Sequence, residues 1–590
     1  MVRLRKLAIG ALFVVLLTPL GARAAPIDAV SSFTYSPNMH ALGFSERAVP
    51  LDNTVAGQGS FNSDLAFWGR TAYQGTYEGF RIIDVHEPDN PVEITNFTGC
   101  VEGTTTGNQG DVLVWDNILI RSWNSPAPSG GRFCGDLFTP AGQEGLHIFD
   151  VSDPLNPVGY AFVPVVQGSH TATLVPDVEN GRLLVYNSAS SAARSGIDIV
   201  EIPLDDPANS SVLRFEASGD PAFSLPNFVT IDPPSSAAGT YQATGAAFGP
   251  QPTVEGVAGD VVLVNDGVAP TSDGCEPFAG FPAGSIALLD RGTCTFVQKV
   301  SNAQNAGAIA VIVANNIAGA PITMGGDDPS ITIPSVMVSL ADGSTIKAGL
   351  PAHGRVSANP LPVRACHDTG VILGDVMKAA CAGGNGFSVW SLDPADGGSL
   401  EDPQILYSRS VPGVGIGHSA SFTWDGEVLI FAHEPGGGGQ AQCQATSSIT
   451  NRSLFFFDAD TGADLGSFVL PRPQTNLENC TWHNFNVVPT RSGNYVLVAG
   501  NYQSGISVVD FTDPTNAREI AFADPAPLVN PQNPAAIELG GDWSTYWYDG
   551  RIYESDITRG LIVWNLSDRA VAGAMRLGHL NPQTQEFSIR

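Results

Sequence analysis

Four of the ten histidines in this sequence stand at the head of short, similar segments. The segments "HTATLVP", "HDTGVIL", "HSASFTW" and "HNFNVVP" begin at His170, His367, His418 and His483. Imidazole is a common ligand of copper and zinc, and its ordinary pKa lies near neutral pH. Histidines at one repeated position therefore indicate a site for a transition metal or an anionic ligand, provided that the fold brings them together.

The histidine segments belong to an internal repeat. Its clearest copies are "GFRIIDVHEPDNPVEI" (79–94), "GLHIFDVSDPLNPVGY" (145–160) and "GISVVDFTDPTNAREI" (505–520), and weaker copies give seven units in all. Each copy is an apolar strand, a turn of Asp, Pro and Asn, and a second strand, and two further apolar runs precede it. This pattern predicts a mainly β fold, a β-propeller of about seven four-stranded blades. Six or eight blades remain compatible with it, because the chain ends are hard to assign.

Alignment of the innermost strands places the four histidines at the mouth of the central channel. The next aligned position holds Asp64, Asp111, Thr171, Asp368, Ser419, Asn484 and Ser544. Glu434 ends the second strand of the fifth blade and faces the same side. The candidate ligand-binding or metal-binding residues are His170, His367, His418, His483, Asp111, Asp368 and Glu434, with copper or zinc as the candidate metal. In the alternative interpretation, each histidine bonds to the backbone of a neighbouring blade and locks the blades together.

The turn sequences carry a family resemblance. "IIDVHEPDNPV", "IFDVSDPLNPV" and "VVDFTDPTNA" resemble the repeats of the LVIVD family of exported β-propellers. With the four weaker units included, the resemblance covers about two-thirds of the chain. It implies a propeller fold and little chemistry, because propellers host many functions.

The repeat is interrupted between the third and fourth units. The interruption contains "GSIALLDRGTCTFVQKVSNAQNAGAIAVIVANN" (284–316) and "ITIPSVMVSLADGSTI" (331–346). These segments resemble the protease-associated (PA) domain, an α/β module. The resemblance implies a non-catalytic domain that restricts access to a neighbouring site or binds a peptide.

These features divide the chain into four expected parts. They are a signal peptide (1–24), the first part of the propeller (25–219), the inserted PA domain (220–361) and the second part of the propeller (362–590). A connection between blades lies on the face of the histidines, so we expect the insertion to cap the channel mouth.

The beginning of the chain predicts export. Arg3, Arg5 and Lys6 precede an apolar run, and Ala22 and Ala24 provide a small-x-small cleavage site, so the expected location is extracellular or periplasmic, in a bacterium. No later apolar run is long enough to span a bilayer, which excludes membrane insertion. The net charge of −30 excludes nucleic acid as a partner.

The eight cysteines are an even number in an exported chain, and no Cys-x-x-Cys pair favours zinc. We therefore expect four disulfides between neighbours. The pairs are Cys100–Cys134, Cys275–Cys294, Cys366–Cys381 and Cys443–Cys480.

Motif searches favour binding over catalysis. The sequence contains no His-Glu-x-x-His, no Gly-x-Ser-x-Gly and no Gly-rich phosphate loop after a strand. The leading hypothesis is a non-catalytic exported scaffold whose propeller face binds a protein, peptide or small-molecule ligand. The alternative is a metal-dependent oxidoreductase, because "SHTATLVP" (169–176) and "ACHDTGV" (365–371) are similar to strands of the selenium-binding proteins, which include copper-dependent methanethiol oxidase. That similarity implies His170, His367, His418 and His483 as ligands of copper or zinc.

Overall fold

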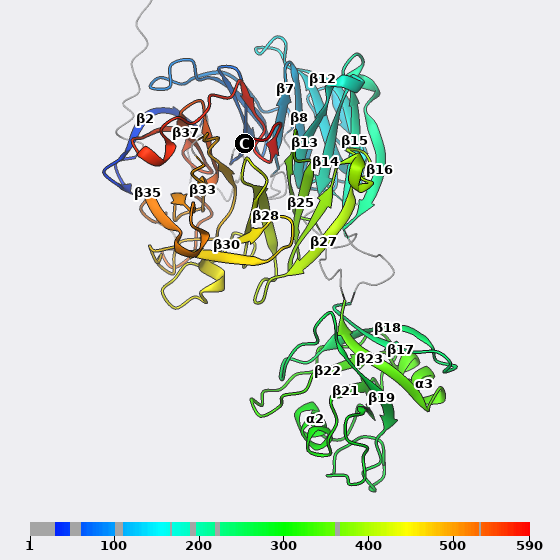
Figure 1. Ribbon diagram of the computed structural model, residues 1–590. Coiled ribbons are helices and arrows are strands. Elements are labelled where there is room, and N and C mark those ends of the chain that lie inside the picture. The colour runs from blue at the N-terminus through cyan, green and yellow to red at the C-terminus, as the bar shows by residue number, and fades with distance from the viewer. Residues whose placement is uncertain are drawn as a thin grey trace, which may run out of the picture.

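The computed structural model describes residues 30–47, 61–100, 110–165, 168–188, 196–218, 225–359, 366–491, 493–529 and 533–589. The signal peptide expected at 1–24 lies outside these ranges. Within them the chain forms a ring of seven antiparallel sheets and a separate closed barrel (Figure 1). The propeller and the PA-type insertion expected from the sequence are both present.

Each blade is a sheet of four main strands. Blade 1 contains β3 (Asn62–Trp68), β4 (Thr71–Thr76), β5 (Gly79–Asp84) and β6 (Val92–Phe97). Blade 2 contains β7 (Val112–Trp115), β8 (Ile118–Trp123), β11 (Glu144–Asp150) and β12 (Val158–Val165), with a hairpin of β9 (Arg132–Cys134) and β10 (Leu137–Thr139). Blade 3 contains β13 (Thr171–Asp177), β14 (Arg182–Ser188), β15 (Gly196–Pro203) and β16 (Ser211–Ala217).

The second part of the ring follows the insertion. Blade 4 contains β24 (Asp368–Ile372), β25 (Lys378–Gly383), β26 (Gly386–Ser391) and β27 (Gln404–Ser410). Blade 5 contains β28 (Gly417–Phe422), β29 (Val428–His433), β30 (Ser453–Asp458) and β31 (Asp464–Val469). Blade 6 contains β32 (Phe485–Val487), β33 (Val496–Gly500), β34 (Ile506–Asp510) and β35 (Arg518–Asp524), with β1 (Thr34–Tyr35) beside β35. Blade 7 contains β36 (Asp542–Tyr548), β37 (Arg551–Asp556), β38 (Gly560–Leu566) and β2 (Met39–Glu46).

The turns between the third and fourth strands of several blades form short 3₁₀ helices. The side chains of Asp393 and Asp513 accept hydrogen bonds from the backbone two residues later, and a proline follows each aspartate. These contacts explain why the repeat carries Asp-Pro at this point. The 3₁₀ helices between third and fourth strands are Pro207–Asn209, Pro394–Asp396 and Pro514–Asn516, and Arg569–Val571 follows the third strand of blade 7. Two others, Val178–Asn180 and Thr450–Arg452, lie at earlier turns of blades 3 and 5.

The N-terminal strand β2 closes the ring. It pairs antiparallel with β38 along its whole length, from Met39 opposite Leu566 to Glu46 opposite Gly560. The ring is therefore completed by strands from both ends of the chain, and in Figure 1 β2 lies beside β37.

The C-terminal segment crosses the opposite end of the channel. Its strands β39 (His579–Leu580) and β40 (Thr584–Gln585) pair with β3 and β24. Asn581, between these two strands, bonds to Val114. The hydroxyl of Thr584, in β40, donates to the Leu174 carbonyl. Gln585 bonds to the Phe422 carbonyl of blade 5, so one segment contacts the inner strands of blades 1 to 5 and plugs the channel on the face away from the histidines.

The insertion is a seven-stranded closed barrel with two helices. Its elements are β17 (Asn227–Ile231), β18 (Gly239–Gly245), β19 (Val257–Leu263), β20 (Ile286–Asp290), α2 (Phe296–Asn305), β21 (Ala310–Ala314), β22 (Ser335–Val338), α3 (Leu340–Ala348) and β23 (Ala352–Ala358). Thr295 and Ser339 cap the two helices through their side-chain oxygens. No helix in the described part of the chain is long and apolar enough to cross a membrane.

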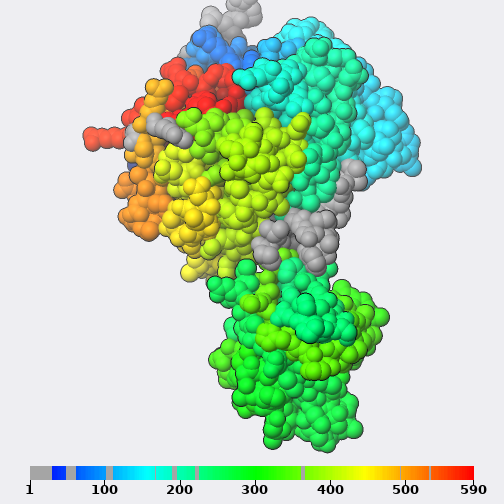
Figure 2. Space-filling view, turned by 45° about the vertical axis from the view of Figure 1, so that its right-hand side comes forward, coloured from blue at the N-terminus to red at the C-terminus, as the bar shows by residue number. Residues whose placement is uncertain are grey.

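The barrel does not cap the channel mouth. Figures 1 and 2 both show it extending beyond the outline of the ring, below blade 4. A groove of about 850 Å³ separates it from that blade, with Thr244 and Val254 on the barrel side and Asn385 and Val411 on the propeller side. The expectation of a cap is therefore wrong. The chain does leave the propeller on the histidine face, but from the end of β16, the outer strand of blade 3. The sequence does not determine the direction in which the barrel extends from that point.

Candidate metal centre

Hydrogen bonds between blades hold the starts of the inner strands at one level. The Thr171 hydroxyl donates to the His367 carbonyl, and the Ser419 hydroxyl donates to the His483 carbonyl at 3.0 Å. Asn484 and Ser544 form an isolated parallel β-bridge through their backbones, between blades 6 and 7. Because each hydroxyl lies one residue beyond a histidine, these bonds place the histidines of adjacent blades next to one another.

The four histidines form a continuous arc at the channel mouth. Ring centroids lie 4.6 Å apart between His170 and His367, 4.2 Å between His367 and His418, and 4.2 Å between His418 and His483. All four are buried, and the most exposed are His170 at 6% and His367 at 8%. The arc is a compact set of imidazoles that is almost closed to water.

Hydrogen bonds fix the tautomers of two of these rings. Nδ1 of His483 donates to the Trp543 carbonyl, which leaves Nε2 as a free lone pair. The Ser419 hydroxyl directs its hydrogen to an acceptor, so it accepts the bond from Nδ1 of His418 at 2.6 Å. His418 therefore also keeps an unprotonated Nε2. Orientation of an imidazole through its other nitrogen is typical of metal ligands.

A carboxylate faces the arc. Oε1 of Glu434 lies 3.7 Å from Nε2 of His483 and accepts a hydrogen bond of 2.7 Å from the Tyr502 hydroxyl. One ligand atom each of His367, His418 and Glu434 lie within 4.8 Å of one another. Gly438, with φ of +68°, passes so close that a Cβ would lie 2.5 Å from Glu434 Oε1, so glycine is required there.

Burial sets the protonation of this cluster. Desolvation lowers the pKa of His170 to about 4 and that of His483 to about 3, and it lowers the pKa values of His367 and His418 well below their ordinary value. The imidazoles are therefore neutral at pH 7, as metal ligation requires. Desolvation also raises the pKa of Glu434 to about 7, so a bound cation would favour its charged form.

The alternative of blade-locking histidines agrees only in part with these contacts. Of the four, the ring of His483 alone bonds to the backbone of a neighbouring blade within the described residues. Nδ1 of His170 and Nδ1 of His367 have no hydrogen-bond partner there. Buried polar atoms are rarely left unpaired, so two such atoms in one cluster indicate a missing ligand.

Disulfides brace the segments that carry the cluster. The four disulfides join Cys100 to Cys134, Cys275 to Cys294, Cys366 to Cys381 and Cys443 to Cys480, as neighbour pairing predicts. Cys366 directly precedes His367, and the Cys443–Cys480 bridge ties the loop after Glu434 to the segment before His483. Four disulfides indicate an oxidising, extracellular or secretory compartment.

The aspartates of the candidate set lie apart from the arc. Asp111 accepts a hydrogen bond of 2.8 Å from the Ala172 amide, and Asp368 accepts one of 2.8 Å from the Thr369 amide. With Asp64 they form a second level inside the channel, where burial raises the pKa of Asp64 to about 6 and that of Asp368 to about 7. Alignment of the repeats places Asp64 at the same position as Asp111 and Asp368, but Asp64 was not among the candidate ligands. Tyr502 occupies no shared position of the repeat, so the alignment did not indicate it.

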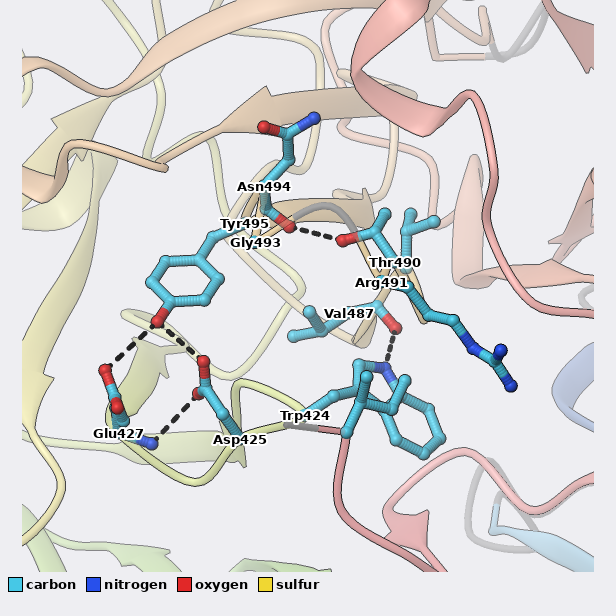
Figure 3. A pocket seen from close by; sticks show the side chains of 11 residues that line it. Trp424, Asp425, Glu427, Val487, Thr490, Arg491, Gly493, Asn494 and Tyr495 are labelled. Carbon is cyan, nitrogen blue, oxygen red and sulfur yellow. Dashed lines mark hydrogen bonds between the residues drawn. The ribbon is translucent and has the colours of Figure 1, made fainter.

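A surface pocket lies on the opposite face, between blades 5 and 6 (Figure 3). It has a volume of about 620 Å³ and is lined by Trp424, Asp425 and Tyr495 among others. The Tyr495 hydroxyl donates to Asp425 at 2.7 Å. None of the residues selected from the sequence lines this pocket.

Comparison with known proteins identifies the insertion. The PA domain family model matches residues 237–346. Vacuolar-sorting receptor 1 of Pisum sativum is 33% identical over 146 residues, which are 22% of this chain and 23% of the receptor. An aminopeptidase of Pseudomonas aeruginosa is 60% identical over 47 residues, which are 8% of this chain and 9% of the enzyme. The chain thus matches about a quarter, or less, of the length of these relatives.

Two solved structures show partial likeness. A zinc aminopeptidase of Bacillus subtilis shares 27% identity, covering 23% of this chain and 32% of that one, with a TM-score of 0.18. The β-propeller domain of Cps50 (Swd1) from Myceliophteria thermophila shares 11% identity, covering 86% of this chain and 98% of that one, with a TM-score of 0.36. Neither structural similarity supports a conclusion about function.

Proposed function

We propose that this protein is an exported metal-binding scaffold whose propeller holds one transition-metal ion at the channel mouth. His367, His418 and Glu434 are the proposed ligands, and His483 is placed to complete the set. The observation that carries the proposal is the convergence of three buried ligand atoms within 4.8 Å of one another. The neutral state of the imidazoles and the free Nε2 atoms of His418 and His483 support it.

The donor set favours copper or zinc. Nitrogen ligands with one carboxylate suit both ions, whereas calcium and magnesium take oxygen ligands. Three protein donors with a fourth nearby also match the ligand number of zinc and copper sites. A metal here would balance the charge of Glu434 and bind the free Nε2 atoms of His418 and His483.

The test is the metal content of the mature protein, purified without a histidine tag or chelator. We expect about one equivalent of copper or zinc per chain, measured by mass spectrometry, from a site built of one ligand set. His367→Ala removes a proposed ligand, so it should lower the bound metal at least tenfold at a fixed free-metal concentration.

His147→Ala is the matched control for this experiment. His147 is also fully buried and bonds to the Thr139 hydroxyl at 2.9 Å, but it lies in blade 2, outside the arc. It should leave the metal content unchanged. Background metal in the wild type, or equal loss in both variants, would make the four histidines structural.

The PA domain supports the scaffold class. A PA family match and the resemblance to vacuolar-sorting receptors and aminopeptidases fit a module that recognises a protein or peptide. We propose that the barrel binds such a partner at the rim of the propeller.

The second candidate function is a metal-dependent oxidoreductase, and one observation favours it. The Tyr502 ring lies 4.5 Å from that of His483, and its hydroxyl donates to Glu434, so a proton donor adjoins the proposed metal ligands. The discriminating assay is thiol oxidation by dioxygen, followed as peroxide release from the metal-loaded protein. If the protein is an enzyme, Tyr502→Phe should lower the oxidation rate at least tenfold without changing the metal content. If it is a scaffold, the metal-loaded protein should oxidise the thiol no faster than the same concentration of free metal.

A further inference from the structure

A small pocket lies on the face of the C-terminal plug, where blades 7 and 1 meet. It is formed by the β3–β4 turn, the turn after β5, the β36–β37 turn and the segment before β39. Its volume is about 220 Å³, which is below the roughly 300–1,000 Å³ of pockets for drug-sized ligands and several times the roughly 30 Å³ of one water molecule. The pocket therefore has room for one small ion or one polar group of a larger ligand.

Hydrogen bonds hold the walls of this pocket in place. The Tyr548 hydroxyl, in blade 7, lies 2.6 Å from the Gly69 carbonyl of blade 1 and 3.1 Å from the Gly578 carbonyl of the plug segment. The Gly69 amide donates to the same Gly578 carbonyl at 2.8 Å, and the Val85 amide donates to the Arg70 carbonyl at 2.9 Å. The backbone that carries the lining side chains is therefore fixed by the fold.

The lining of the pocket has the opposite charge to the rest of the protein. The whole sequence has 58 acidic against 28 basic residues. Three arginines, Arg70, Arg551 and Arg576, line this pocket, with His86 beside them and Asp549 as the one acidic residue of its described lining. In a chain of net charge −30, such a convergence of cations creates a local attraction for anions.

Two of the three guanidinium groups have no carboxylate partner in the described part of the chain. Nη1 of Arg70 lies 3.0 Å from Nε2 of His86, and Nη1 of Arg551 donates to the Gly550 carbonyl at 2.8 Å. Nε of Arg551 is buried and has no hydrogen-bond partner among the described residues. Buried donors are rarely left unpaired, so these contacts indicate an anionic ligand.

The acidic groups nearby leave the pocket positive. Oδ1 of Asp549 lies 3.5 Å from Nε of Arg576. Glu87 lies 3.5 Å from the His86 ring, but its side chain is 68% exposed and does not line the pocket. Three arginines and one lining carboxylate leave a surplus of two positive charges.

We propose that this pocket binds a doubly charged tetrahedral oxyanion, a phosphate or sulfate group, through Arg70, Arg551 and Arg576. A planar guanidinium group donates two parallel hydrogen bonds to the oxygens of such a group. Two negative charges balance the surplus of the lining, whereas chloride or a single carboxylate supplies one. The histidine arc lies on the opposite face, so the inference stands without the proposed function.

The experiment is titration calorimetry of the mature protein with sodium phosphate and, separately, with sodium sulfate, in low salt with sodium chloride as the reference anion. We expect one site per chain for at least one of the two oxyanions and none for chloride, and the comparison shows which oxyanion the pocket takes. Arg70→Ala and Arg551→Ala should each raise the Kd about tenfold or more, because each removes charge-assisted hydrogen bonds.

Asp549→Asn should act in the opposite direction. It removes the negative charge of the lining, so it should lower the Kd about threefold. Asparagine tolerates the left-handed backbone at this position, where φ is +44°.

Arg518→Ala is the matched control. It removes the same charge from a blade 6 arginine outside the pocket, whose side chain is 72% exposed and lies 2.9 Å from Asp510. This variant should leave the Kd unchanged. Circular dichroism shows whether each variant is folded, and if Arg551→Ala is not, the exposed Arg70→Ala decides. No binding of either oxyanion, equal binding of chloride, an unchanged Kd in Arg70→Ala, or an equal rise in Arg518→Ala would overturn the proposal.

Discussion

Deleting residues 39–46 should abolish cooperative folding of the propeller. These residues are β2, the outer strand of blade 7, and their loss exposes the edge of β38 and removes Met39 from the core between blades 6 and 7. It also leaves Arg81 of blade 1, which is 1% exposed, without its bonds to the Ser45 hydroxyl at 2.8 Å and the Glu46 carbonyl at 2.7 Å. Arg81 keeps its ion pair with Glu93 and its bond to Gln74, but a buried guanidinium that loses two acceptors is still costly. Circular dichroism melts and limited proteolysis measure the result.

A point substitution in β2 tests the same closure of the ring with a smaller structural change. A Cβ at Gly43 would lie 2.2 Å from the Pro88 carbonyl and 2.7 Å from the Pro91 ring, so Gly43→Val forces β2 away from blade 1. We expect a loss of about 3 kcal/mol in the free energy of unfolding.

The control is excision of the insertion, with a short linker in place of residues 219–365. The barrel has its own cores, separate from those of the blades, so the remaining propeller should melt cooperatively near the wild-type propeller transition. A strand deletion that melts like the wild type would show that the ring holds without its N-terminal strand.

The repeat made most of this fold predictable. An apolar run followed by Asp-Pro identifies the outer strands of a blade, because each aspartate bonds to its own turn. The two segments that complete the ring carry no such signature. Residues 39–46 pair with β38 over a distance of more than 500 residues, and residues 579–585 bond to five different blades, so their roles arise only from tertiary contacts.

The site was predictable to the extent that it follows the repeat. His170, His367, His418 and His483 share one position, and the structure brings their rings into contact. Asp111 and Asp368 stand at the next position of the repeat. Because successive side chains of a strand point to opposite sides, their carboxylates lie at a different level of the channel from the histidines. The tautomers of His418 and His483 and the bond from Tyr502 to Glu434 depend on neighbours that sequence spacing does not reveal.

Asn581→Ala should be the most damaging single substitution in the C-terminal plug. Asn581 is 1% exposed and bonds to both backbone groups of Val114, accepting from the amide at 2.8 Å and donating to the carbonyl at 2.9 Å. Alanine leaves both groups of an inner strand without their partner inside the channel. Each unsatisfied buried group costs about 1–3 kcal/mol, so we expect a loss of about 3 kcal/mol, measured as a lower midpoint of denaturant unfolding with an unchanged slope.

Gln585→Ala provides the graded comparison within the same segment. Gln585 makes one such bond, from Nε2 to the Phe422 carbonyl at 3.0 Å, and its Oε1 atom is already unpaired in the described part of the chain. Its removal should therefore cost about 1 kcal/mol, clearly less than the loss at Asn581. The order of the two effects is the informative result, because it follows from the number of backbone groups that each side chain satisfies. If both variants unfold at the wild-type midpoint, the plug is not held by these bonds.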